Sequence, residues 1–385
     1  MNDRQVRLEQ LLGYLEVDSG NFALLSEVAD LYLQNGDWAN ARGVVERALA
    51  LQPQHPVTRY RMAVILLGER RPEQSLAITQ DLLDAGETHI AVRFEHGRGL
   101  AMSARFEEAE PVLAGLLSDA ASFPELPHLY IRTLHYLGKV EQAIEFGAGY
   151  AAEHPDDAVA QGMLSLLFLD NNDLGQAAAL SASALDKAPD NMDALLAAGS
   201  VALAFEKEDE AQTFFDKAIS IHANSGRAWL GKGLVSMLHA DLDSARADLQ
   251  KAVELMPKHL GTYNTLAWIQ ILQRDHDAAK KTLETSLEVD ANFGETHGGL
   301  AVLAAIEGDW DNAKRLADIA VRLQPESFSG QFARSLILGH RNHPERGQAL
   351  LESMFSNFKV PGGGNLQDAL QRFARKRQNR SGRLH

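Results

Sequence analysis

One segment comes within a single residue of a phosphate-binding loop. Residues Gly226–Gly233 read GRAWLGKG, whereas the loop pattern GxxxxGK ends on Ser or Thr, whose hydroxyl reaches the magnesium ion of a bound nucleotide. Gly233 stands at that last position and has no hydroxyl, and no strand pattern precedes the segment. We therefore predict that the segment lies on a helix and binds no phosphate.

A second segment has the start of a calcium-binding loop. Asp170–Gly175 read DNNDLG, and oxygen ligands of this kind suit a hard cation. However, Leu174 stands where a ligand belongs, and Ser181 stands where the loop requires a bidentate glutamate. We predict a turn between two helices at this place.

The other residues with catalytic potential show no arrangement that indicates a reaction. The chain has no cysteine, which excludes disulfides, thiolate metal sites and a cysteine nucleophile. Its 14 histidines are scattered without an HExxH pattern. We predict no catalytic site, no metal and no cofactor, and hence a protein that is not an enzyme.

The composition is that of a folded protein with an acidic surface. The 385 residues are 45% hydrophobic and carry a formal net charge of −15, which argues against general binding to nucleic acids or anionic membranes. The longest uncharged runs, such as Ala194–Phe205, are shorter than the ~18 residues that span a bilayer. The first residues show no signal-peptide pattern. We expect no membrane span and a cytoplasmic location.

The secondary-structure elements that position these residues can be predicted from an internal repeat. The same residue types recur at every thirty-fourth position, in one register over ten units that begin at Phe22. One column is small throughout: Ala41, Ser75, Ala109, Ala143, Ala177, Ala211, Ala245, Ala279, Ala313 and Gly347. A second column, twelve residues upstream, is small except at Ile131: Ala29, Ala63, Gly97, Ile131, Ser165, Gly199, Gly233, Ala267, Ala301 and Ser335. Each unit reads as two helices, because apolar or small residues recur at helical spacing on both sides of a breaker such as Gly36-Asp37. Facing small columns allow the two helices to approach closely, and stacking of units supplies the core.

These columns resemble the tetratricopeptide repeat family, whose pattern is Trp-x2-Leu-Gly-x2-Tyr followed by Ala, Phe and Pro at fixed offsets. Gly36-Asp37-Trp38 and Gly308-Asp309-Trp310 match the interhelix turn of that family closely. The resemblance covers residues 22–361 and implies an all-α, right-handed superhelical solenoid of helix-turn-helix repeats. It also implies a concave groove, lined by the first helices, that binds peptides, and it implies no reaction.

Two flanking segments complete the predicted organisation. Residues 1–21 are expected to form an N-terminal capping helix, with Val6, Leu8, Leu11, Leu12 and Leu15 apolar. Residues 362–385 are expected to form a glycine hinge and a basic amphipathic tail, which has six bases and one acid from Asn365 onward. Asn365 and Asp368 look like an N-cap pair. One face of the tail is apolar and the other basic: Leu366, Leu370 and Phe373 against Arg372, Arg375, Lys376 and Arg377. The tail either caps the tenth repeat or folds back into the groove.

The family geometry places the ninth and thirteenth residues of each unit on the concave surface. In repeats 7 to 9 both positions are apolar, and two neighbours widen the strip: Leu234, Met237, Leu238, Trp268, Ile271, Leu272, Val302 and Ile306. A soluble protein rarely leaves such a patch open, so we predict a partner-binding strip with Trp268 as its central anchor. The alternative is that tight curvature buries these residues among neighbouring first helices.

A basic set on the first helices of repeats 2 to 4 suggests a second recognition element. It includes Arg98, Arg132 and His128, which we expect either to bind acidic groups of a partner or to pair with Glu27, Glu95 and Glu125. The family's carboxylate clamp, made of Lys, Asn and Arg, is not matched, because Asn264 stands alone. We do not predict binding of a chaperone C-terminus.

The function predicted from the sequence is that of a non-enzymatic scaffold or chaperone-like adaptor. It would hold a protein or peptide partner, amphipathic and with acidic residues, in the concave groove. Two alternatives stay open at this point. One is a self-assembling structural subunit, and the other is a regulatory subunit of an enzyme or transcription factor, gated by the tail.

Overall fold

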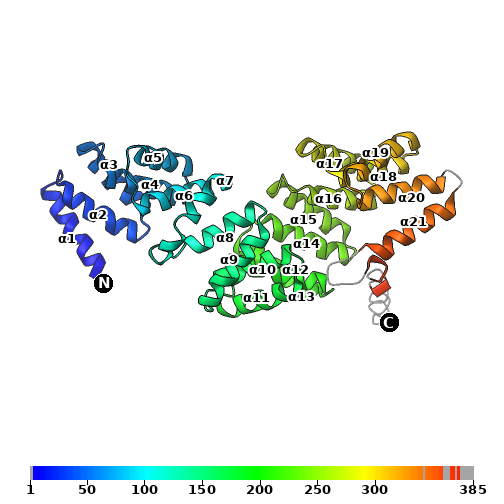
Figure 1. Ribbon diagram of the computed structural model, residues 1–385, viewed down its shortest axis with the longest axis horizontal. Coiled ribbons are helices and arrows are strands. Elements are labelled where there is room, and N and C mark those ends of the chain that lie inside the picture. Colours follow the sequence, from blue (N-terminus) through cyan, green and yellow to red (C-terminus); the bar gives the residue numbers. More distant parts are fainter. Residues whose placement is uncertain (1–2, 341–342, 359–364, 369–370, 373–385) are drawn as a thin grey trace. The chain divides into compact units, whose positions relative to one another are not determined.

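The structure is a computed structural model that describes residues 3–340, 343–358, 365–368 and 371–372. The described residues form twenty-one α-helices and one short 3-10 helix (Figure 1). The chain divides into two compact units, Met1–His154 and Pro155–His385, so the predicted repeat segment 22–361 is shared between them. The predicted all-α fold of consecutive helix-turn-helix repeats is confirmed.

The first unit contains the N-terminal helix and four repeats. Its helices are α1 (Asp3–Val17), α2 (Phe22–Gln34), α3 (Trp38–Leu51), α4 (Pro56–Gly68), α5 (Pro72–Asp84), α6 (Ile90–Met102), α7 (Phe106–Ala114), the 3-10 helix η1 (Leu117–Ser122), α8 (Leu126–Tyr136) and α9 (Val140–Glu153). The third repeat is irregular: Pro111 lies inside α7, which ends early and is followed by η1.

The second unit contains the remaining six repeats. Its helices are α10 (Ala158–Asp170), α11 (Leu174–Lys187), α12 (Met192–Ala204), α13 (Glu208–Ile221), α14 (Gly226–Leu238), α15 (Leu242–Leu255), α16 (Leu260–Leu272), α17 (His276–Val289), α18 (Gly294–Ile306), α19 (Trp310–Leu323), α20 (Phe328–His340) and α21 (Pro344–Asn357). From Trp38 to Pro344, the second helices of the repeats begin at every thirty-fourth position, without exception.

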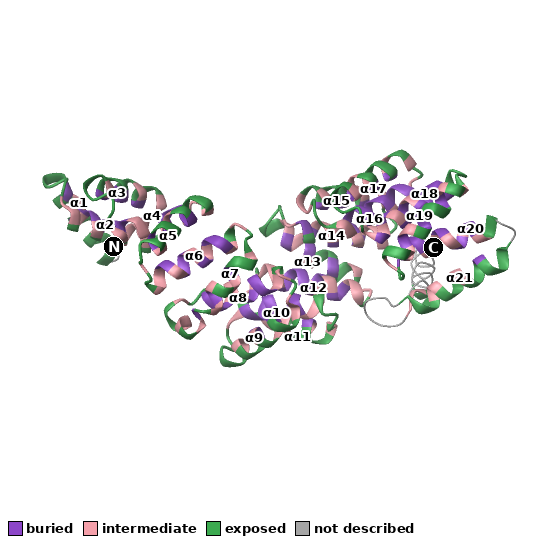
Figure 2. Cartoon of the chain, turned by 45° about the horizontal axis from the view of Figure 1, so that its top comes forward, coloured by how far each residue is buried: buried purple, intermediate pink, exposed green. Residues whose placement is uncertain are grey.

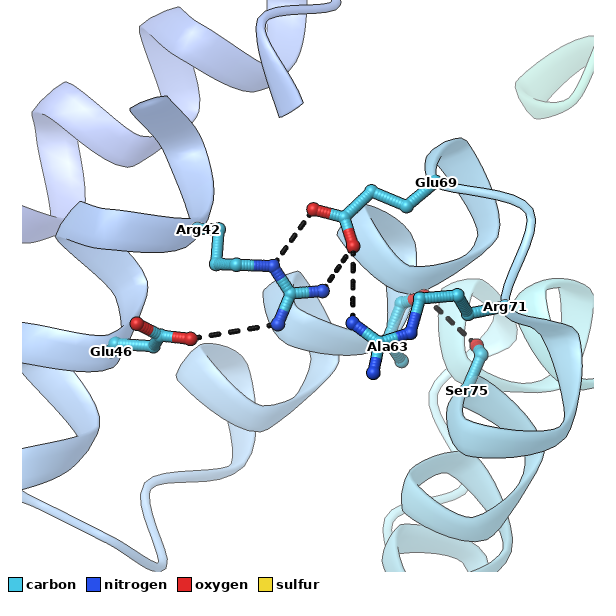
Figure 3. Close-up of polar contacts among 6 residues, drawn as sticks. All are labelled: Arg42, Glu46, Ala63, Glu69, Arg71 and Ser75. Carbon is cyan, nitrogen blue, oxygen red and sulfur yellow. Dashed lines mark hydrogen bonds and ion pairs between the residues drawn. The ribbon is translucent and has the colours of Figure 1, made fainter. Parts of the chain in front are cut away.

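The small columns lie where the two helices of a repeat meet. Ala211 and Gly199 are both buried, as are their equivalents in the other repeats. Figure 2 shows buried residues in purple on helices of both units. In the second repeat the contact includes a hydrogen bond, because the Ser75 hydroxyl donates to the Ala63 carbonyl at 2.9 Å (Figure 3). Larger side chains at these columns would separate the helices, so small residues fix the distance within each repeat.

The turn between the two helices of a repeat has one conformation throughout the described repeats. Its middle residue has a positive φ at every thirty-fourth position: Gly36, Arg70, Ala104, Gly138, Asn172, Glu206, Ala240, Arg274 and Gly308. A left-handed residue ends a helix and lets the following N–H groups return to its last carbonyls. An aspartate then begins the second helix in half of the repeats, for example Asp37, whose side chain accepts from the Asn40 N–H at 3.2 Å.

The N-terminal helix covers the first repeat. Leu11 and Leu15 of α1 are buried in one cluster with Leu25 and Val28. Farther along this unit, charged side chains join successive repeats. Arg42 of α3 binds Glu69 at the end of α4, and Arg71 lies 3.6 Å from the same carboxylate (Figure 3).

Only part of the predicted tail lies within the described residues. The hinge at 362–364 and the residues Leu370, Phe373, Arg375, Lys376 and Arg377 fall outside them. The predicted N-cap is confirmed, since Asn365 Oδ1 accepts from the Asp368 N–H at 2.8 Å. The Leu366 N–H donates to the Phe358 carbonyl at 2.9 Å, which returns the chain toward the end of α21.

Candidate functional site: an apolar groove in the second unit

The first helices of repeats 5 to 8 line a groove with a volume of about 930 Å³, called the groove below. Helices α10, α12 and α14 lie side by side (Figure 1), and α16 contributes Leu272. Most of the lining is leucine and methionine: Leu166, Leu169, Leu174, Leu196, Leu203, Leu230, Leu234, Met237, Leu238, Met256, Leu272 and Leu366. An apolar floor of this size is typical of a surface that holds another apolar chain.

The position of the floor depends on one phenylalanine beneath it. Phe215 of α13 is 1% exposed and belongs to the core cluster that includes Leu166, Leu196 and Val235. A Cβ atom at Gly199 would lie 2.7 Å from its ring, and one at Gly231 would lie 2.3 Å from it. Glycine on both α12 and α14 therefore lets the ring fit between the two helices that carry the centre of the groove.

One rim of the groove is acidic. Asp170, Glu206 and Glu208 line it at the turns that end α10 and α12. Glu206 is the left-handed turn residue of its repeat, with a φ of 57°. Arg227 lies on the same lining, with its guanidinium 3.4 Å from the Asp170 carboxylate. The described tail residues Leu366 and Arg372 also line the groove, and Arg372 Nε donates to Glu206 Oε1 at 2.7 Å.

His259 lies at another edge of the groove, where it contacts the Thr262 hydroxyl through Nδ1 at 2.7 Å. Burial lowers the pKa of His259, and the Arg227 guanidinium lowers it further. The imidazole is therefore neutral at pH 7 and adds no positive charge to the groove.

The structure brings some of the predicted strip into the groove. Leu234, Met237, Leu238 and Leu272 line it, and Leu272 is 58% exposed. Ile306 is 46% exposed but lies outside the lining. Val302 is fully buried and Ile271 is 9% exposed, so neither offers a surface to a partner.

Trp268 belongs to the packing of the last repeats rather than to the groove lining. Its ring is half-buried against Phe328 and Phe332, and its indole N–H donates to the Ser329 hydroxyl at 3.2 Å. Close approach of the first helices explains this burial. A Cβ atom at Gly298 of α18 would lie 2.4 Å from the Gly330 backbone nitrogen of α20. Val302 is therefore buried and Trp268 half-buried, whereas the role of either residue in partner binding stays a prediction.

The predicted basic set lies in the first unit, where Arg98 contacts acidic side chains and His128 contacts an aromatic one. Arg98 pairs with Glu95 at 2.8 Å and lies 3.5 Å from Glu125. Burial raises the pKa of Glu95, although Arg98 acts in the opposite direction. His128 lies edge-on to Tyr150 at 5.7 Å between ring centroids, and Arg132 on the same helix is half-buried. Binding of acidic partner groups by this set stays a prediction.

Sequence reasoning missed the half of the groove that precedes repeat 7. The strip was defined by the ninth and thirteenth residues of each unit, whereas the fifth and twelfth also line the groove. Leu196 is a fifth residue, and Leu169 and Leu203 are twelfth residues. Reading those two columns in repeats 5 to 7 would have located the floor. Glu206 and Glu208 belong to no repeating apolar column, because their position beside the groove depends on the turn between two helices.

The two segments with motif-like spacing are structural. Gly226–Gly233 lies at the start of α14, and Asp170–Gly175 is the turn between α10 and α11, as predicted. Across the described ranges, no three histidine, aspartate or glutamate side chains are grouped closely enough to hold a metal ion. No helix in the same ranges is both long and apolar enough to cross a membrane.

Comparison with known proteins agrees with the repeat geometry. A family profile described as tetratricopeptide repeat matches residues 8–93, 168–234 and 237–306, which together are more than half of the chain. No curated protein matches the chain significantly in sequence.

Several solved structures are similar in fold. The Cut9–Hcn1 hetero-tetramer of the APC/C is 14% identical, with 92% of this chain and 84% of that chain covered and a TM-score of 0.54. Yeast Tom70 is 16% identical, with coverages of 91% and 81% and a TM-score of 0.42. At 14% identity, the similarity to the Cut9–Hcn1 structure shows the fold alone. Together with the profile match, the repeat geometry shows that the chain belongs to the tetratricopeptide repeat family.

Proposed function

We propose that the chain is a non-enzymatic interaction scaffold whose groove holds an apolar segment of a partner protein. Its role would be that of an adaptor or chaperone-like protein in the cytoplasm. The family to which it belongs is one of protein-interaction scaffolds. The observation that carries the proposal is the leucine and methionine floor of the groove, supplied by successive first helices.

The contacts of the floor favour a helical or extended segment over a small molecule. The apolar residues come from the first helices of four successive repeats, α10, α12, α14 and α16, and therefore form a long surface rather than a closed chamber. Leu234 and Leu238 lie one turn apart on α14, and both are half-exposed. An apolar side chain of a partner placed over this pair gains about 25 cal/mol for each Å² of apolar surface removed from water.

The proposal is tested with peptides selected from a random displayed library on the purified chain. We expect the selected peptides to be rich in leucine, methionine or phenylalanine at helical spacing. A Leu234→Asp, Leu238→Asp double variant should bind these peptides at least tenfold more weakly in calorimetric titrations. Burying one unpaired charge costs more free energy than a tenfold loss of affinity represents.

The matched control is Ile306→Asp, which places the same charge on an exposed apolar position outside the groove. Circular dichroism of all variants verifies that the helices remain. Equal affinity of the selected peptides for the wild type and the groove variant would refute the proposal.

A further inference from the structure

The kind of partner that fits the groove is indicated by the chain's own tail. We propose that the groove recognises a basic amphipathic helix, and that the tail, of which the structure describes residues 365–368 and 371–372, is such a ligand held within the same chain. This inference rests on the proposed function, because it names the chemistry of the segment that the groove binds. It implies that a partner must displace the tail.

The first observation is that the tail supplies one apolar and one basic contact. Leu366 lines the groove beside the leucine floor, and Arg372 reaches the acidic rim, where its Nε donates to Glu206 Oε1 at 2.7 Å. Side chains six residues apart on a helix point in different directions. A leucine and an arginine at this spacing can therefore contact the floor and the rim together.

The second observation is charge complementarity. The described acidic residues of the lining are Asp170, Glu206 and Glu208, and its only described basic residue outside the tail, besides the neutral His259, is Arg227. The tail carries six bases and one acid from Asn365 onward, whereas the rest of the chain is acidic overall. A basic segment is thus attracted to this rim, and an acidic segment is repelled.

The third observation is that local contacts prepare the tail for helical binding. Asn365 caps the turn that begins at Leu366, and the Ser356 hydroxyl donates to Gln367 Oε1 at 3.1 Å. Phe358, which precedes the tail, packs edge-on against Phe328 with 5.4 Å between ring centroids. These contacts hold the start of the tail close to the groove and raise its effective concentration there.

The contact is weak enough to be displaced. Arg372 and Glu206 have side chains that are 46% and 26% exposed, and exposed ion pairs of this kind contribute little. This pair and one half-buried leucine hold the tail, so a competitor must displace it. A tail that fills the groove for about nine-tenths of the time weakens binding of a competitor about tenfold.

The test uses a fluorescein-labelled synthetic peptide with the sequence of residues 365–377, NLQDALQRFARKR, and full-length chains. Fluorescence anisotropy compares the wild type with a Leu366→Asp, Arg372→Glu variant, whose own tail is released. We expect the released variant to bind the peptide with a Kd about tenfold lower than the wild type.

Adding Glu206→Arg to the released variant should weaken peptide binding at least tenfold, because the rim then repels the arginine of the peptide. The matched control adds Glu210→Arg, which makes the same change of charge on an exposed residue outside the lining and should leave the Kd unchanged. A peptide with Arg372→Glu should regain affinity for the Glu206→Arg chain.

Equal Kd values for the wild type and the released variant would overturn the inference, and so would a Glu206→Arg variant that binds like its control. These failures are distinguishable from failure of the proposed function. If library-selected peptides bind the floor but the tail peptide does not, the scaffold proposal stands and the inference fails.

The absence of cysteine from the sequence allows a second test of whether the tail binds within one chain. Glu208→Cys and Gln371→Cys flank the ion pair without removing it. A short bis-maleimide should join them within a monomer far faster than it joins Gln371→Cys to Lys280→Cys, an exposed position on α17. Cross-linked dimers in place of monomers would contradict binding in the same chain.

Discussion

Replacing Gly231 by alanine is expected to destabilise the second unit, although alanine is the better helix former. The new Cβ atom would lie 2.3 Å from Cζ of Phe215, which is 1% exposed and packed within a core cluster. Overpacking of this kind costs about 1–3 kcal/mol. The higher helix propensity of alanine stabilises the folded state by about 0.5–1 kcal/mol. The free energy of unfolding should therefore fall by up to about 2.5 kcal/mol.

The cause of this loss is isolated by a double-mutant cycle. Phe215→Ala alone should cost about 3–5 kcal/mol. In the Gly231→Ala, Phe215→Ala double variant the clash is absent, so the cost should not exceed that of Phe215→Ala. The two substitutions should thus be non-additive by about 1–3 kcal/mol. If Phe215→Ala does not fold, Phe215→Leu serves in the same cycle.

The assay is equilibrium unfolding in urea, followed by far-UV circular dichroism. The matched control is Gly339→Ala on α20, where nothing lies within 4 Å of the added methyl group, and stability should rise by about 0.5–1 kcal/mol. Additivity of the Gly231 and Phe215 substitutions within about 0.5 kcal/mol would refute the argument that the ring sets the distance between α12 and α14.

The same packing and turns support three further predictions. Ala104→Gly and Ala240→Gly, at left-handed turn positions with φ of 56° and 60°, should each raise the free energy of unfolding by about 0.5–1 kcal/mol in urea titrations. The pKa of His259 is lowered, chiefly by burial, so the unfolded state binds the proton more readily. Stability should fall as the pH drops through about 6.5, and calorimetry should find a smaller fall for His259→Asn. Leu11→Ala should lower the stability of the first unit by about 2–4 kcal/mol, because Leu11 is 1% exposed where α1 covers α2.

The repeat register was predictable because it depends on local chemistry that recurs in the sequence. Small residues at Ala211 and Gly199 mark where two helices touch, and the breaker before Trp38 or Trp310 marks a turn. Both signals recur at the same positions of successive repeats. Helix boundaries that are ambiguous in one repeat can therefore be assigned from the others. The turn residues themselves were less predictable, because Arg70, Ala104 and Glu206 adopt a positive φ without being glycine.

The groove was only partly predictable because exposure depends on how far neighbouring first helices approach. Leu238 and Val302 both lie at apolar first-helix positions, yet Leu238 lines the groove and Val302 is fully buried. The difference arises from close packing of α18 on α20 at Gly298 and Gly330. This packing depends on contacts between two repeats. It cannot be predicted from the residue type at a single position of each repeat.

The place of the tail was left open by the sequence for a related reason. Its apolar and basic faces were readable, but they fit either a cap on the tenth repeat or the groove. The contact that favours the groove joins Arg372 to Glu206, which lie 166 residues apart. Because Glu206 belongs to a turn and not to a repeating column, the periodicity gave no reason to select it as a partner.

The central claim, that the groove binds the partner segment, is tested most directly by photo-cross-linking. A library-selected peptide with a benzophenone at its central apolar residue is irradiated with the full-length chain and mapped by mass spectrometry. The account predicts cross-links on α12 and α14, at or beside Leu203, Leu234 and Met237, and their loss in the Leu234→Asp, Leu238→Asp variant. Cross-links that persist in that variant, or that map to the first unit, would contradict it.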